Sequence, residues 1–176
     1  MKLCRDSLTL VLAVFAVSIS TAQEPVDAWW LHAKFVPNDT EYQSLAVAKI
    51  NPNWLKISIL SFAALPPESR ADVIWMHRNG FDFEVADFFK RKNLIDRELC
   101  GVFEDRAGRK GRFLLVLERR DAGPWKVAFL HQEYGQPGFS VLLRNRTRLY
   151  WGTCMRCGEF NRLRLKQGHF YLEPAN

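Results

Sequence analysis

Short runs of hydrophobic residues, separated by turn-forming residues, fill the second half of the chain. From residue 81 onward, runs such as RFLLVLER, WKVAFLHQEY and FSVLLRN are joined by short connections rich in Gly, Asp and Asn. In FNRLRLK, Phe160, Leu163 and Leu165 mark an apolar side, and Arg162 and Arg164 mark a polar side. This pattern of hydrophobic runs and short turns predicts an antiparallel β-meander of six to seven strands over residues 81–176, either propeller-blade-like or an open sheet.

Residues 23–80 carry a more helical pattern. In NDTEYQSLAVAKI, Asp39 or Thr40 can cap a helix that continues to Ile50. The segment 54–62 fits a helical stripe, although its β-branched Ile57 and Ile59 would suit a strand, and we expect a helix there.

A further short element is predicted over PESRADVIWMHRNG, where Asn79-Gly80 ends it. The order of short helices followed by strands predicts an α+β fold, with a mainly helical part over residues 23–80 and a β-rich part over residues 81–176 of one domain.

The N-terminus has the layout of a cleaved secretory signal. Lys2 and Arg5 precede an apolar run, and small residues follow it up to Ala22. The apolar run is too short to cross a bilayer as a helix. We therefore expect cleavage of residues 1–22 near Ala22–Gln23 and a periplasmic or secreted protein without a membrane anchor.

The charge of the chain favours acidic partners. The formal net charge is +6, and removing residues 1–22 takes away two basic residues and one acidic residue, which leaves about +5. A basic protein attracts acidic protein surfaces, and export makes nucleic acid an unsuitable target.

The spacing Cys154-x-x-Cys157 is compatible with a disulfide, a zinc site or a redox centre. Export favours a disulfide between these two residues, which would fix the shape of a turn between strands. Zinc binding would need Cys100 and His169 to complete four ligands, and a redox centre would need a helix N-terminus beside Cys154. A disulfide from Cys100 to one of the pair is the remaining alternative.

Basic residues gather on the C-terminal strands and turns. Such a group is either a polar face in contact with solvent or a cationic docking surface, and we expect it to bind a partner. The residues are Arg144, Arg146, Arg148, Tyr150, Arg156, Arg162 and Arg164.

No arrangement typical of catalysis stands out in the sequence. The four histidines, His32, His77, His131 and His169, do not have the spacing of paired ligands. His131 and Glu133 can face the same side of a strand, but the sequence places no nucleophile beside them. Nucleophile elbows, phosphate loops and dinucleotide fingerprints are missing, so we expect a binding protein without a cofactor rather than an enzyme.

Residues 87–118, DFFKRKNLIDRELCGVFEDRAGRKGRFLLVLE, resemble one eroded unit of the FG-GAP/VCBS-type calcium-loop repeat. In that family an acidic, glycine-containing loop precedes a strand, and a turn leads to a second strand. Asp87 and Asp96 stand where the first and last acidic ligands would be, but Lys90, Arg91 and Lys92 replace further ligands. The resemblance implies antiparallel strands of the propeller-blade type, with Asp87 and Asp96 as the remnant of a metal site.

These observations favour an exported binding protein. By analogy with β-rich periplasmic inhibitors and immunity proteins, its partner would be an acidic protein such as a cell-wall hydrolase or toxin, neutralised by occlusion of an acidic cleft. The alternatives are a thiol–disulfide oxidoreductase that uses Cys154 and Cys157, and a structural or assembly factor of the cell envelope.

Overall fold

The computed structural model describes residues 28–175. The expected signal peptide, residues 1–22, lies outside this part of the chain. Among the described residues, no helix combines the length and the apolar character that crossing a membrane requires.

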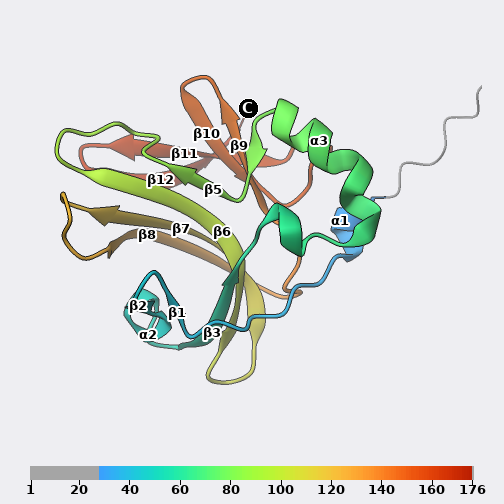
Figure 1. The fold of residues 1–176 in the computed structure, drawn as a ribbon, viewed down its shortest axis with the longest axis horizontal. Coiled ribbons are helices and arrows are strands. Elements are labelled where there is room, and N and C mark those ends of the chain that lie inside the picture. Colours follow the sequence, from blue (N-terminus) through green and yellow to red (C-terminus); the bar gives the residue numbers. More distant parts are fainter. Residues whose placement is uncertain (1–27, 176) are drawn as a thin grey trace, which may run out of the picture.

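Two antiparallel sheets dominate the structure and pack face to face (Figure 1). The strand order of the first sheet is β3-β6-β7-β8, and β5 pairs with the same edge of β6 as β3 does. Its strands are β3 (Trp54–Ile59), β5 (Glu84–Ala86), β6 (Ile95–Asp105), β7 (Lys110–Arg119) and β8 (Lys126–Tyr134).

The second sheet has the strand order β12-β11-β10-β9-β4. Hairpins connect β9 through β12, whereas the short edge strand β4 comes from earlier in the chain. The strands are β4 (Phe81–Asp82), β9 (Val141–Asn145), β10 (Arg148–Gly152), β11 (Phe160–Lys166) and β12 (His169–Pro174).

Short elements cover the sheets at their ends. Helix α3 is the longest helix of the described residues and lies beside the β9–β10 hairpin (Figure 1). The short elements are α1 (Trp29–His32), β1 (Glu41–Tyr42), β2 (Leu45–Ala46), α2 (Val47–Ile50), two 3₁₀ turns (Phe62–Ala64 and Pro67–Ser69) and α3 (Arg70–Arg78).

Strand β6 is buried on both faces, so the described chain has two hydrophobic cores. Cys100 and Val102 belong to the core between the two sheets, together with Trp151 and Leu163 of the second sheet. Leu99 and Phe103 alternate with them and belong to a second core, which Trp54, α2 and β2 close from the other side. The two-sided burial explains the nearly continuous hydrophobic runs of β6 and β7.

The antiparallel β structure predicted for residues 81–176 is confirmed, but the described residues are mostly β, so the predicted α+β class is confirmed only in part. The described residues contain 12 strands, nine of which (β4–β12) lie in residues 81–176, where six to seven are predicted. The chain passes from one sheet to the other between β8 and β9, so the strands do not form a single meander. The described part of residues 23–80, the segment predicted to be mainly helical, contains α1, α2, α3 and two 3₁₀ turns. It also contains the strands β1, β2 and β3.

The helix predicted over residues 54–62 is wrong. Residues Trp54–Ile59 form β3, and Ile57 pairs with Phe103 of β6 and is fully buried. The helix predicted to end at Ile50 shrinks to the single turn of α2, because Leu45 and Ala46 pair with β1. In both places pairing with a neighbouring strand outweighs the local helical pattern, since local propensity is a weak force beside tertiary contacts.

Candidate functional site

The structure joins Cys154 and Cys157 in a disulfide within the loop between β10 and β11. The two Cα atoms lie 5.6 Å apart, and the backbone N–H of Cys157 donates a hydrogen bond to Cys154 Sγ at 3.0 Å. Cys154 is buried, whereas Cys157 is exposed. No helix begins at Cys154, so the dipole that lowers the pKa of an attacking thiol in redox enzymes is missing here.

Cys100 and His169, the two residues that could complete a zinc site, lie apart from this pair. Cys100 is fully buried between the sheets, and burial raises the pKa of its thiol. His169 is exposed at the start of β12. Within residues 28–175, no group of three or more His, Cys, Asp or Glu side chains is arranged to hold a metal ion.

Arg156 extends from the disulfide-closed loop toward α3 and α1. Its Nη2 atom lies 3.0 Å from Asp72 Oδ1, and its guanidinium lies 5.5 Å from the ring of Trp75 and 5.8 Å from the ring of Trp30. The indole N–H of Trp29 donates to the other oxygen of Asp72 at 2.9 Å. The disulfide loop is thereby fastened to both helices.

The β9–β10 hairpin presents Arg144, Arg146 and Arg148 to solvent. Arg146 occupies the turn with a φ of 52°. None of the three forms an ion pair with any described residue, so their charges are not neutralised.

Gly80 holds this hairpin against the end of α3. The N–H of Arg144 donates to the carbonyl of Gly80 at 2.8 Å, and Gly80 has a φ of +79°. A Cβ atom at position 80 would lie 2.4 Å from the carbonyl oxygen of Arg144. The close approach therefore requires glycine for both its backbone angle and its lack of a side chain.

Tyr150, Arg162 and Arg164 lie on the outer face of the second sheet, together with Glu173. Tyr150, Arg162 and Glu173 are directly opposite one another on β10, β11 and β12. Arg164 Nη1 lies 2.7 Å from Glu173 Oε1, and Arg162 Nη1 lies 4.0 Å from the same atom. Two arginines thus share one carboxylate, so this face keeps a positive charge.

A shallow groove runs between the end of α3 and the β9–β10 hairpin. It has a volume of about 660 Å³ and is lined by Arg78, Arg144 and Arg146, with Trp75, Phe81 and Leu143 among its apolar residues. Within residues 28–175, no carboxylate lines this groove. Trp75 and Arg78 were not predicted as site residues; the available signal was an aromatic residue and an arginine three positions apart in the short element PESRADVIWMHRNG.

Asp87 and Asp96, the proposed remnant of a calcium site, do not come together as ligands. Asp96 is fully buried and accepts a hydrogen bond from the N–H of Phe89 at 3.3 Å, while Asp87 is exposed. Arg91 contacts both Asp96 and Glu118. The charge of Asp96 is therefore balanced in part by a guanidinium.

Glu98 lies beside Asp96 on β6 and is buried just as deeply. Its two carboxyl oxygens have no hydrogen-bond partner among the described residues. Burial, and then the negative charge of Asp96, raises the pKa of Glu98 to about 9. The carboxyl is therefore protonated at neutral pH.

His131 and Glu133 face the same side of β8, as their spacing predicts. His131 Nε2 lies 3.5 Å from Glu133 Oε1, and Arg112 Nε lies 2.8 Å from the other oxygen of Glu133. The ring of His131 packs edge-on against Trp151. These contacts orient the two side chains. Among the described residues, His131 has no hydrogen bond to a serine, threonine or cysteine that could act as a nucleophile.

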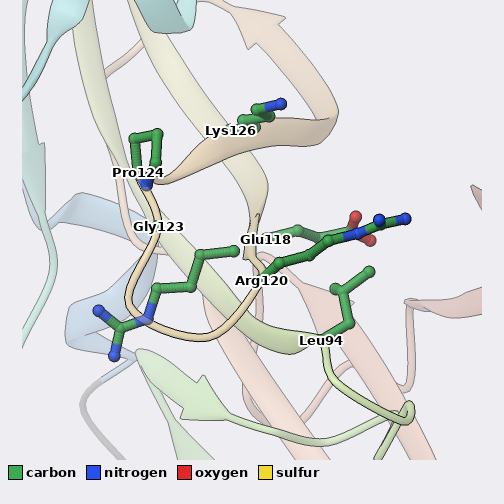
Figure 2. Close-up of a pocket in the computed structure, with 7 residues that line it drawn as sticks. Leu94, Glu118, Arg120, Gly123, Pro124 and Lys126 are labelled. Atoms are coloured by element: carbon green, nitrogen blue, oxygen red, sulfur yellow. The ribbon is translucent and has the colours of Figure 1, made fainter.

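A further pocket of about 380 Å³ lies at the turn between β7 and β8 (Figure 2). Leu94, Glu118 and Lys126 come from three separate segments, and Figure 2 shows that their side chains do not converge on a common point. The pocket mixes one carboxylate with several cations, so it does not favour one class of ligand.

Comparisons with protein-family models, with curated proteins and with solved structures found no match to this chain.

Proposed function

We propose that this chain is an exported protein-binding module, periplasmic or secreted after cleavage near Ala22–Gln23, which recognises an acidic protein partner. The observation that carries the proposal is the β9–β10 hairpin, where Arg144, Arg146 and Arg148 are exposed and lack ion pairs with any described residue. Unpaired surface arginines raise the local positive potential and favour association with an acidic surface.

The rigidity of this surface supports a docking role. The hairpin is continuous with a five-stranded sheet, and the Gly80–Arg144 backbone hydrogen bond fixes it against α3. A surface that is already ordered loses less conformational entropy when it binds. Arginine and tyrosine are also enriched among the residues that contribute most to protein–protein affinity.

The partner class that fits this surface best is an enzyme with an acidic cleft, such as a cell-wall hydrolase or toxin. Most glycoside hydrolases use two carboxylates that flank the bond to be broken, so their clefts attract cations. The hairpin bearing Arg144, Arg146 and Arg148 would enter such a cleft and block the substrate, which is the action of an inhibitor or immunity protein.

Affinity capture from envelope extract, followed by binding measurements with the purified captured protein, tests the proposal. Arg144→Glu/Arg146→Glu/Arg148→Glu reverses three charges on the hairpin, and Arg120→Glu/Lys126→Glu is a control at another exposed basic site. We expect the hairpin variant to weaken binding by at least about tenfold, the control to bind like the unmodified protein, and the affinity to fall as salt rises. Equal affinity of the hairpin variant and the unmodified protein would contradict the proposal.

If the captured protein degrades cell wall, its activity provides a second measurement. We expect a stoichiometric amount of this protein to stop peptidoglycan hydrolysis, and the hairpin variant to leave the hydrolysis unchanged. If the captured protein binds but its hydrolase activity is not inhibited, the chain recognises this partner without neutralising it.

A further inference from the structure

The groove between α3 and the β9–β10 hairpin combines an exposed aromatic ring with unpaired cations. Trp75 is 37% exposed although it is a large apolar side chain, and the preceding Ile74 is 61% exposed. Arg78 follows one turn later on α3, and Arg144 and Arg146 border the groove from the hairpin. A solvent-facing helix surface is normally polar, and an exposed apolar side chain among cations there does not stabilise the fold.

Trp75 is held in position from two sides. Its ring lies 5.2 Å from the ring of Phe81, and the guanidinium of Arg156 lies 5.5 Å from it. The carboxylate of Asp72 fixes Arg156 in turn. The indole therefore offers a preorganised apolar surface, and a ligand that packs on it loses little additional side-chain entropy.

The charges that border the groove have one sign. Arg78, Arg144 and Arg146 form no ion pair with any described residue, and no carboxylate lines the groove. Arg78 also lies in the last turn of α3, near the negative end of the helix dipole. That end carries only a partial charge, so it does not cancel the full positive charge of Arg78. A ligand that fits must bring negative charge.

We propose that this groove binds an acidic peptide segment of the protein partner, with one aromatic or aliphatic side chain packed on Trp75 and carboxylates paired to Arg78, Arg144 and Arg146. This inference rests on the proposed function and assigns it a locus and a chemistry of recognition. Carboxylates accept paired hydrogen bonds from guanidinium groups, and the apolar contact adds affinity that salt does not screen. Anionic polysaccharide would also satisfy the cations, so its competition with the peptide is one outcome of the test.

Selection of random displayed peptides of about twelve residues on the purified, oxidised protein tests the inference. We expect the enriched peptides to carry carboxylates on both sides of an aromatic or aliphatic residue. Synthetic copies should bind, and copies with Gln and Asn in place of Glu and Asp should lose binding. Failure to enrich any peptide, or enrichment of peptides without acidic residues, overturns the inference.

Two variants locate the peptide in the groove. Trp75→Ala removes the apolar surface, and Arg144→Glu/Arg146→Glu reverses charges that lie on an exposed hairpin, so the second variant remains informative if the first unfolds. We expect each to weaken the selected peptide by at least about tenfold, while Arg120→Glu/Lys126→Glu stays within about twofold. Unchanged binding to either groove variant places the peptide elsewhere and overturns the inference, as does equal competition by polygalacturonate.

The outcome for the groove is separable from the outcome for the proposed function. Arg148 and Arg162 lie beside Tyr150 on the outer face of the second sheet. If Arg148→Glu/Arg162→Glu abolishes binding of the captured envelope protein while Trp75→Ala does not, this outer face is the docking surface and the groove is not. If all of these variants bind the captured protein equally, both the groove and the proposed function fail.

Discussion

Arg156 Nη2 lies 3.0 Å from Asp72 Oδ1, which fastens the disulfide-closed loop to α3. The same carboxylate accepts the indole N–H of Trp29 through its second oxygen. One side chain, 14% exposed, therefore connects three segments that are far apart in the sequence. The loop with the two cysteines contributes to structure through this arginine as well as through its disulfide.

Replacing Asp72 tests how much this connection contributes. We expect Asp72→Ala to lower the free energy of unfolding by about 1–2 kcal/mol, because the part-buried indole N–H of Trp29 and the exposed guanidinium of Arg156 lose their acceptor. Asp72→Asn keeps an acceptor for Trp29 and loses only the charge, so its loss should be smaller. Urea unfolding followed by tryptophan fluorescence measures both, and equal midpoints for Asp72→Ala and the unmodified protein would show that the contacts are not stabilising.

Removal of the disulfide should have a modest effect on stability. Closing a loop of four residues lowers the entropy of the unfolded chain by an amount equivalent to about 2 kcal/mol. We expect Cys154→Ser/Cys157→Ser to show a loss of that size in urea. The unmodified protein treated with a reductant should show the same loss, and a loss several times larger would mean that the disulfide supports more than its own loop.

The pKa of Glu98 makes stability depend on pH. Its folded-state pKa of about 9 is above the ordinary value of 4.5, so the folded protein holds a proton that the unfolded chain releases. The stabilising contribution is fully present below about pH 4.5 and is lost as pH rises toward 9, by at most about 1.4 kcal/mol per pH unit.

We expect Glu98→Gln to remove most of this slope, because glutamine is neutral throughout and has a similar shape. Unfolding free energies from pH 5 to about pH 9 measure the difference. Parallel pH profiles for the variant and the unmodified protein would show that Glu98 is ionised in the folded state. Asp96, Arg91 and Glu118 are the charged neighbours, and all remain in both proteins.

Gly80 and Gly108 form a matched pair for testing the contact between α3 and the hairpin. Both have positive φ, +79° and +76°, but a Cβ atom at Gly80 would collide with Arg144, whereas nothing lies within 4 Å at Gly108. We expect Gly108→Ala to cost about 1 kcal/mol from backbone strain and Gly80→Ala about 3 kcal/mol or more. Thermal unfolding compares them, and similar losses would mean that the hairpin moves away freely.

Strand β11 could be predicted from sequence because its alternation reflects burial on one side, whereas β6 and β7 read as continuous hydrophobic runs because both of their faces are buried. Leu163 is buried between the sheets, and Arg162 and Arg164 lie on the opposite face, as FNRLRLK predicts. Phe160 is three residues from Leu163 and therefore lies on the other face, where it is 6.2 Å from Phe81. Its assignment to the apolar side shared with Leu163 is wrong, because the outer face is also covered near α3.

The candidate site could be predicted only in part. Proximity in sequence suggested one cluster of arginines, but the alternation of strands and the course of the disulfide loop divide them among the hairpin, the sheet face and the contact with Asp72. The groove depends on the packing of α3 against a hairpin more than 60 residues later. Hydrophobic periodicity carries no information about such a contact between distant segments.

Burial of Cys100 has a consequence for oxidative maturation. If the predicted signal peptide with Cys4 is removed, an extended chain offers Cys100, Cys154 and Cys157 to an oxidant alike, and two of the three possible pairings of these residues are non-native. Once β6 lies between β7 and its other neighbours, the thiol of Cys100 has no exposed surface. The yield of natively paired protein then depends on whether the sheets form before or after the cysteines are oxidised. A chain that forms its sheets first has only the native pairing left, whereas a chain oxidised first depends on a disulfide isomerase.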